Sequence, residues 1–124
     1  MRYRGFLYAG LMIADGAPRL VEYNVRFGDP ECQVLMMRLG AQALDLMLAC
    51  AEGRLAEARV NWAEDHALTV VMAANGYPGP VAKGSQIRGL GELPEDSRRM
   101  VFHAGTSARD GQIVAAGGRV LNVT

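Results

Sequence analysis

Residues 22–31 of the chain read EYNVRFGDPE, and this stretch decides the fold. As far as Arg26, its apolar and polar side chains alternate with the period of two that is typical of a β-strand. Phe27 and Gly28 end the alternation. Asp29 has a side chain that can cap the free N–H groups of a helix, and Pro30 suits the first helical position. The stretch therefore predicts a strand that passes directly into a helix.

The residues before this stretch predict a partner for the strand. Residues 5–13, GFLYAGLMI, are apolar, partly aromatic and too short for a helix, which indicates a buried strand. Residues 14–18, ADGAP, have the composition of a turn. Residues 19–26 alternate, and we expect them to pair with 5–13 as an antiparallel hairpin. The alternation places Val21, Tyr23 and Val25 on a face toward the core, and Glu22, Asn24 and Arg26 on the other face.

The residues after the stretch predict two helices and a connector. A helical pattern reaches Gly53, with a break at Gly40. Its apolar residues recur at helical spacing, which predicts packing against a core. Residues 54–66 are polar and indicate a connector, in which we expect Trp62 to cover the edge of a core. The apolar helical residues are Val34, Leu35, Leu39, Leu44, Met47 and Leu48.

From residue 67 the pattern changes to short strands separated by glycine-rich turns. We expect strands at 67–74, around Ile87, at 100–105 and over 112–124, with a turn at 75–80. Such a pattern favours a small β barrel or sandwich. The fold class is therefore α+β, divided into segment 1–53, connector 54–66 and a truncated β-rich domain 67–124. Both ends look cut, so we expect an exposed strand edge at 120–124 and self-association of the fragment.

The composition excludes several classes of protein. The chain has 13 basic and 13 acidic residues, so no basic field attracts nucleic acid or a membrane surface. It has no apolar run of about 18 residues and no signal-peptide pattern. Cys32 and Cys50 have no Cys or His neighbour at metal-ligand spacing, which indicates reduced core residues. We expect a cytoplasmic protein with no nucleic-acid and no membrane partner.

The polar face of the predicted hairpin is the candidate for chemistry. Glu22, Asn24 and Arg26 follow one another at about 7 Å on one face of a strand. A carboxylate and an amide oxygen are ligands that Mg²⁺ accepts, and an arginine suits an anionic oxygen. The N-terminal end of the following helix also favours an anion. The spacing alone leaves two interpretations open, because the same residues could simply be the solvated face of a hairpin.

Several segments together resemble a known family. They are LYAGLMI (7–13), LVEYNVRFGDPECQVLMMRL (20–39), MAANGYPG (72–79), VFHAGT (101–106) and GGRVL (117–121). In this order and spacing they resemble the C-terminal portion of the phosphoribosylamine–glycine ligase (glycinamide ribonucleotide synthetase) family, within the ATP-grasp superfamily. The resemblance covers essentially the whole chain. Gly40-Ala41-Gln42 departs from a more polar junction in the family, away from the candidate site.

The resemblance implies an architecture and roles for the residues. It implies the C-terminal end of an ATP-grasp domain, hairpin plus helices, followed by a small β-rich domain. Glu22 and Asn24 would bind the Mg²⁺ or Mn²⁺ ions that bridge the phosphates of ATP. Arg26 would be catalytic and, with Gly28 and Asp29, would lie beside the acyl-phosphate and glycine site.

Arg119 is a further candidate, near the ribose phosphate of the substrate. Residues 117–119, GGR, could instead form a β-bulge. His66 and His103 are isolated, and we expect them to be structural.

The reaction implied by the resemblance is ligation. ATP, glycine and 5-phosphoribosylamine would give glycinamide ribonucleotide, ADP and phosphate through a glycyl phosphate, in de novo purine synthesis. The chain has no glycine-rich nucleotide loop, no lysines placed to hold phosphates and no second metal-binding carboxylate beside Glu22. We therefore expect the isolated chain to be inactive. The alternatives are a non-catalytic β module and the C-terminal part of another ATP-grasp enzyme, such as a biotin-carboxylase-like protein; RFGDPE (26–31) favours the ligase.

Overall fold

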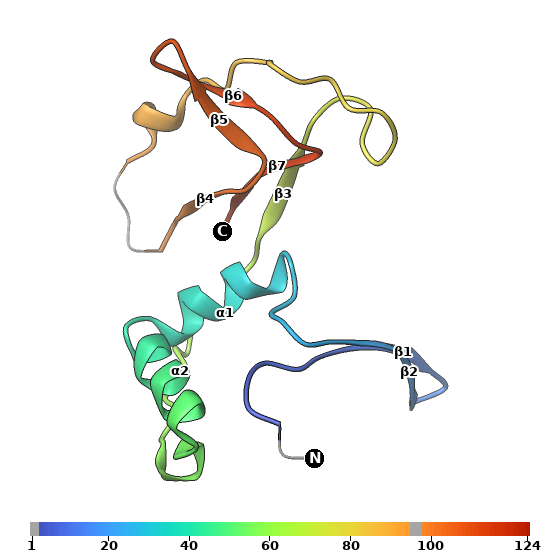
Figure 1. Cartoon of the computed structure of the whole chain (residues 1–124), viewed down its shortest axis with the longest axis vertical. Coiled ribbons are helices and arrows are strands. Elements are labelled where there is room, and N and C mark those ends of the chain that lie inside the picture. The colour runs from blue at the N-terminus through green and yellow to red at the C-terminus, as the bar shows by residue number, and fades with distance from the viewer. Residues whose placement is uncertain (1–2, 95–97) are drawn as a thin grey trace. The chain divides into compact units, whose positions relative to one another are not determined.

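The structure is a computed structural model that describes residues 3–94 and 98–124. The chain divides into two compact units, Met1–His66 and Ala67–Thr124. The first unit contains β1 (Tyr8–Ala14), β2 (Ala17–Asn24), α1 (Glu31–Leu39), α2 (Gln42–Glu52) and a 3₁₀ turn, η1 (Leu55–Glu57) (Figure 1). The second contains β3 (Val70–Ala73), a 3₁₀ turn, η2 (Leu90–Glu92), β4 (Val101–His103), β5 (Thr106–Arg109), β6 (Gln112–Ala115) and β7 (Arg119–Val123).

The first unit begins with the predicted antiparallel hairpin of β1 and β2. Its two-residue loop is Asp15-Gly16, with φ of 52° and 75°, the left-handed conformations that a tight hairpin requires. The register shifts between Gly10 and Leu11, because Gly10 pairs with Glu22 whereas Leu11 pairs with Leu20. Val21 is thus an extra residue, and the strict alternation predicted for 19–26 is interrupted there. The strand also ends at Asn24, two residues before Arg26.

The bulge changes which residues share a face of the hairpin. Beyond it, Leu20 lies opposite Leu11, on the face that also carries Tyr23 opposite Ala9. This apolar face was expected to be turned toward a core, but Tyr23 is 59% exposed and Val25 is 74% exposed. The expectation is wrong for the described chain, because a two-stranded ribbon buries a face only where a second layer covers it.

The two predicted helices form, with the break at Gly40. Gly40 has φ 58°, and the axes of α1 and α2 are bent by 106° at this point. Gly53 ends α2 in the left-handed conformation, and the N–H of Arg54 donates to the Ala49 carbonyl at 2.8 Å. The prediction of core packing is wrong for Leu44 and Leu48, which are 72% and 52% exposed, because α2 instead buries the small residues Ala43 and Ala49.

In the described ranges no single helix is long and apolar enough to cross a membrane. Only α1 and α2 taken together reach that length and composition, and they are the bent pair.

Residues 54–66 pack back on the helices of their own unit. The Arg38 guanidinium donates to the Ala63 carbonyl at 2.9 Å, and the Ala63 N–H donates to the Arg38 carbonyl at 3.0 Å. The same guanidinium lies 5.4 Å from the centre of the Trp62 ring, at a distance suited to a cation–π interaction. The Gln42 side chain accepts the N–H of Asn61 at 2.9 Å. These contacts give the connector a defined path.

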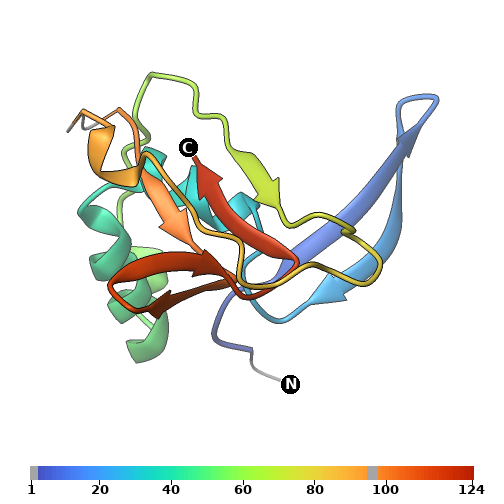
Figure 2. The same cartoon turned by 90° about the horizontal axis from the view of Figure 1, so that it is seen from above.

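The second unit has its core around its last strand. The sheet order is β3-β7-β4, so β7 is the central strand, antiparallel to both neighbours (Figures 1 and 2). Leu121 of β7 is 2% exposed and packs with Val120 and Ala115. The exposed edge expected at 120–124 is therefore wrong, since both sides of β7 are hydrogen-bonded. Alternation alone does not distinguish a central strand from an edge strand.

Two further features of this unit differ from expectation. Residues 106–109 were not predicted as a strand, yet they form β5 and pair with β6 across an Asp110-Gly111 turn. The region of Ile87 is not part of a named strand, but it pairs with β6 through an isolated bridge between Gln86 and Val114, and the Ile87 N–H donates to the Ile113 carbonyl at 2.9 Å. Residues 112–124 form two strands that join different sheets. The described residues thus form a mixed α/β structure with two helices and antiparallel sheets. Within residues 67–94 and 98–124 the strands close no barrel.

The central strand predicts a large stability effect. Leu121→Ala should lower the free energy of unfolding of the second unit by about 3 kcal/mol, because it leaves a cavity in the core. The matched change Leu68→Ala, at a side chain that is 77% exposed in the same unit, should cost less than about 0.5 kcal/mol. Urea unfolding followed by circular dichroism compares the two variants. Equal losses would contradict the central position of Leu121.

Candidate functional site

The polar face at the end of β2 gathers three of the residues singled out in the sequence. Asn24 Nδ2 donates to Glu22 Oε1 at 2.8 Å, so the two side chains lie on the same face, as the period of two predicts. Arg26 lies just beyond the strand, where Nη1 donates to the Phe27 carbonyl at 2.8 Å. Its Nη2 lies 3.5 Å from Asn24 Oδ1. A carboxylate, an amide and a guanidinium thus form one polar rim, which we call the Glu22–Arg26 rim.

The oxygen atoms of this rim suit a hard divalent cation. Mg²⁺ takes one or two protein oxygens and completes its shell with phosphate and water, so Glu22 and Asn24 are chemically suited to hold part of its shell. In the described ranges no group of three His, Cys, Asp or Glu side chains could hold a metal ion. The rim therefore offers two oxygen-bearing side chains and requires further ligands from elsewhere.

Tyr8 and Glu31 adjoin the rim and were missed in the sequence analysis. Tyr8 lies opposite Asn24 in the hairpin register, and its hydroxyl donates to Glu31 Oε1 at 3.0 Å. Gly28 allows this contact, since a Cβ there would lie 2.9 Å from Glu31 Cδ and 2.9 Å from Tyr8 Cε2. The sequence held only a weak signal for Tyr8. The period of two places Tyr8 and Gly10 on the same face of β1, but only the register of the hairpin shows that this is the face of Glu22 and Asn24.

The loop between β2 and α1 holds Gly28 and Asp29. The helix begins at Glu31, and Pro30 takes the cap position with φ −100° and ψ 15°. The prediction of Pro30 as the first helical residue, with Asp29 as the cap, is therefore wrong by one residue, because the backbone of Pro30 is not yet helical. Asp29 Oδ1 instead accepts a hydrogen bond from Gln33 Nε2 at 3.3 Å. The Cys32 N–H donates to the Gly28 carbonyl at 3.0 Å and closes the first turn.

A hydrogen bond and nearby charges shift the pKa of Tyr8. The hydrogen bond to Glu31 raises the pKa of Tyr8 above its ordinary value, and the charges of Glu31 and Glu22 act in the same direction. Arg26 lowers it by a smaller amount, so residues of the rim and of α1 all act on this hydroxyl. Burial and the charge of Asp29 also raise the pKa of the Cys32 thiol, which favours its protonated form. Both Cys32 and Cys50 are free thiols.

The remaining candidates lie in other parts of the chain. Arg119 belongs to the second unit, at the start of β7, where its Nε donates to the Tyr77 hydroxyl at 3.1 Å. The register of β3 and β7 shifts beside it, since Met72 pairs with Leu121 and Ala73 with Arg119, so the extra residue is Val120, one position after residues 117–119. His103 Nδ1 lies 3.0 Å from Thr106 Oγ1, in a local structural contact.

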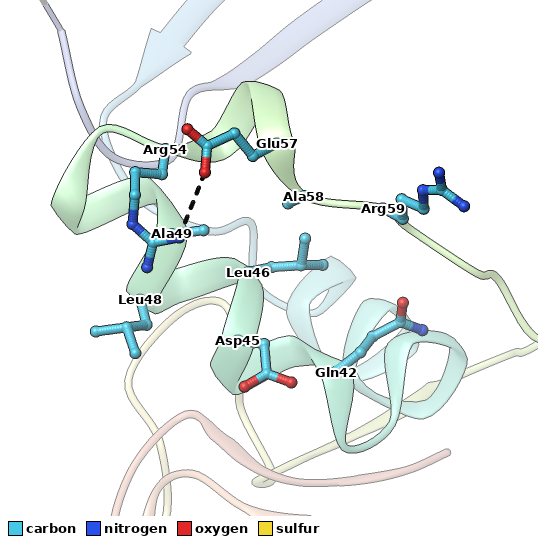
Figure 3. Close-up of a pocket in the computed structure, with 9 residues that line it drawn as sticks. All are labelled: Gln42, Asp45, Leu46, Leu48, Ala49, Arg54, Glu57, Ala58 and Arg59. Carbon is cyan, nitrogen blue, oxygen red and sulfur yellow. Dashed lines mark ion pairs between the residues drawn. The ribbon is translucent and has the colours of Figure 1, made fainter.

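A separate pocket of about 370 Å³ lies beside α2 (Figure 3). Arg54 Nη1 and Glu57 Oε2 form an ion pair of 3.7 Å at this pocket, while Asp45 projects from α2. Gln42, which also lines it, is held by the Leu39 carbonyl and by Asn61. No residue of the Glu22–Arg26 rim lines this pocket, so it carries none of the predicted chemistry.

Comparison with known proteins gives one consistent result. Residues 67–124 match the family model of the phosphoribosylglycinamide synthetase C domain, and residues 1–32 match that of the ATP-grasp (A) domain of the same synthetase. Phosphoribosylamine–glycine ligase of Brucella melitensis is 57% identical over 122 residues, or 98% of this chain. The chloroplastic phosphoribosylamine–glycine ligase of Arabidopsis thaliana is 51% identical over 99% of the chain.

A solved structure shares the fold. The crystal structure of phosphoribosylamine–glycine ligase from Thermotoga maritima aligns over 97% of this chain with a TM-score of 0.74 and 40% sequence identity. The chain spans 29% of the Brucella protein, 24% of the Arabidopsis protein and 29% of the Thermotoga chain.

The contact between Tyr8 and Glu31 predicts a measurable change in pKa. Glu31→Ala should lower the pKa of Tyr8 toward its ordinary value of 10.0, because the hydrogen bond and the negative charge both favour the protonated phenol. In the unaltered chain the contact is complete at neutral pH and is lost as the pH rises through the raised pKa. The measurement is NMR titration of the tyrosine rings in the metal-free chain, with Glu64→Ala as the control. A Tyr8 pKa that is the same in both variants would contradict the contact.

Proposed function

The chain belongs to the phosphoribosylglycinamide synthetase family, and on that premise we propose that it forms part of an ATP-dependent carbon–nitrogen ligase. The reaction would join glycine to 5-phosphoribosylamine in de novo purine biosynthesis. One observation carries the proposal: the stretch EYNVRFGDPE brings Glu22, Asn24 and Arg26 into one polar rim at the end of β2. The high identity to ligases over nearly the whole chain supports it.

The proposed reaction has two steps. A carboxylate oxygen of glycine attacks the γ-phosphorus of ATP, the bond from that phosphorus to the bridging oxygen breaks, and ADP leaves with the electron pair. The amine of 5-phosphoribosylamine then attacks the carbonyl carbon of glycyl phosphate. The carbon–oxygen bond breaks, phosphate leaves, and the nitrogen loses a proton to give glycinamide ribonucleotide. The first step concentrates negative charge on phosphoryl oxygens, so catalysis depends mainly on positioning and charge stabilisation.

The rim would supply part of that stabilisation. Glu22 and Asn24 would hold Mg²⁺ or Mn²⁺ by their oxygen atoms, and the ion would neutralise charge on the ATP phosphates. Arg26 would stabilise anionic oxygens of the transferring group, because its guanidinium is permanently charged and offers several N–H donors. Its contacts with Asn24 and the Phe27 carbonyl hold it beside the residues that would bind the metal.

Other residues would contribute to substrate binding. Gly28 and Asp29 would lie beside glycine, in the loop that leads to the positive N-terminal end of α1. Arg119 would support the ribose phosphate of the substrate. In the complete ligase we propose that the strands of residues 67–124 belong to a small barrel-like or sandwich-like domain.

The metal role of Glu22 can be tested in the complete ligase that contains these residues. Glu22→Gln should lower kcat by about 100-fold or more, because it removes the anionic oxygen ligand while keeping the side-chain shape. The control Glu64→Gln, at an exposed connector position, should stay within about 2-fold of the parent. Steady-state rates of ADP formation, with glycine and 5-phosphoribosylamine present, provide the measurement. Full activity of Glu22→Gln would refute the assignment.

The isolated chain should bind ATP poorly. One carboxylate and one amide cannot hold the metal ions and phosphates of ATP without further ligands, so no micromolar affinity for Mg-ATP is expected. Isothermal titration of the 124-residue chain with Mg-ATP tests this expectation, with ATP in excess EDTA as the reference. Micromolar binding that depends on Mg²⁺ would show that these residues suffice for a nucleotide site.

A further inference from the structure

We propose that Tyr8 and Glu31 are positioning residues of the ligase site, which hold the Glu22–Arg26 rim in its working geometry. The inference rests on the proposed function and deepens it, because it assigns a role to two residues that contact no proposed substrate. Tyr8 acts from the strand opposite the rim, and Glu31 acts from the first turn of α1. Together they tie the hairpin to the helix across the loop that carries Arg26.

The position of Tyr8 follows from the register of the hairpin. It lies directly opposite Asn24, and Gly10 lies opposite Glu22. Side chains directly opposite each other in an antiparallel pair are about 4.5–5.5 Å apart at Cβ, so Tyr8 is a neighbour of Asn24 on the polar face. The small size of Gly10 leaves the space beside Glu22 clear, since a Cβ there would lie 3.3 Å from Glu22 Cγ. Tyr8 is thus the residue of β1 that lies directly opposite Asn24.

The hydroxyl of Tyr8 then reaches the helix. It donates to Glu31 Oε1 at 3.0 Å, and the two residues are 23 positions apart in the chain. Between them the chain leaves β2 at Asn24 and enters α1 at Glu31, so Arg26 lies on a six-residue loop bounded by the contact. A hydrogen bond that closes such a loop reduces the range of positions its residues can take.

Gly28 makes the closure compact. A side chain at this position would meet Glu31 Oε2 and would lie 2.9 Å from the Tyr8 ring, so the loop passes between the two partners without a Cβ. The backbone there is fixed as well, because the Gly28 carbonyl accepts the Cys32 N–H at 3.0 Å. Two residues of the RFGDPE stretch therefore take part in this contact: Glu31 accepts the hydrogen bond from Tyr8, and Gly28 leaves the space for it.

The hydrogen bond between Tyr8 and Glu31 lies on the surface. A positioning role can therefore be distinguished from a stabilising one. An exposed hydrogen bond adds little to the free energy of folding, because water replaces it when it breaks. A geometric contribution to the rim would instead appear in the metal dependence of the reaction. Loss of the contact should loosen Asn24 and Arg26 while the fold remains intact.

The test uses the complete ligase with Tyr8→Phe, which removes only the hydroxyl. We expect the Mg²⁺ concentration for half-maximal activity to rise by about 3- to 10-fold, the range of one lost hydrogen bond. The melting temperature should stay within about 2 °C of the parent. The matched control is Tyr23→Phe, on the opposite face of the same hairpin, which should change the metal dependence by less than about 2-fold.

Glu31 provides the second arm of the test. Glu31→Ala should match Tyr8→Phe, and the double variant should be no worse than either single variant, because both changes break one contact. Glu31→Gln keeps an acceptor for the hydroxyl and should restore part of the loss.

Several outcomes would overturn the inference. They are an unchanged metal dependence in Tyr8→Phe, additive losses in the double variant, and a lower melting temperature with normal metal dependence. Each of them leaves the proposed function standing if Glu22→Gln is inactive. An active Glu22→Gln enzyme would instead refute the proposed function itself.

Discussion

The antiparallel register of β1 and β2 is the constraint on which the site depends. Because side chains alternate along each strand, the pairing of Gly10 with Glu22 and of Tyr8 with Asn24 places all four residues on one face. A shift by one residue would turn Glu22 and Asn24 together to the other face of the hairpin, away from Tyr8 and Gly10. The tight Asp15-Gly16 loop and the bulge at Val21 together fix this register. The loop sets the pairing at the tip of the hairpin. The extra residue at Val21 then shifts the pairing by one, so that Glu22 lies opposite Gly10.

Local chemistry allowed much of the fold to be predicted from the sequence. The hairpin, the passage from strand to helix after Gly28 and the break at Gly40 follow from alternation, turn residues and glycine placement. The bulge at Val21 could not be predicted, because it depends on how two strands pair and not on either strand alone. The central position of β7 was missed for the same reason, as was β5, whose polar residues gain strand structure only by pairing with β6.

The candidate site shows the same division between local and paired information. Strand period alone indicated that Glu22 and Asn24 share a face, and they are hydrogen-bonded at 2.8 Å. Strand period could not indicate Tyr8, whose relation to the rim appears only once β1 is aligned with β2. Nor could it indicate Glu31, because the hydrogen bond between Tyr8 and Glu31 forms only where the loop passes close to both side chains at Gly28. Residues that act through neighbours are therefore less visible in a sequence than residues that carry the chemistry.

The two faces of the hairpin have a common physical requirement. One face carries the Glu22–Arg26 rim, whose oxygen donors are too few to complete a metal shell. The other carries Leu11, Leu20 and Tyr23, which are at least half exposed, and a two-stranded ribbon gains stability only when such a face is covered. In the complete ligase that we propose, the rest of an ATP-grasp domain would supply the missing metal ligands and cover the apolar face. Covering that face would also fix the position of the two strands, and therefore of the rim on their other side. Completing the nucleotide site and completing the hydrophobic core would then be one structural event, and the metal affinity of the rim would rise with the stability of the hairpin.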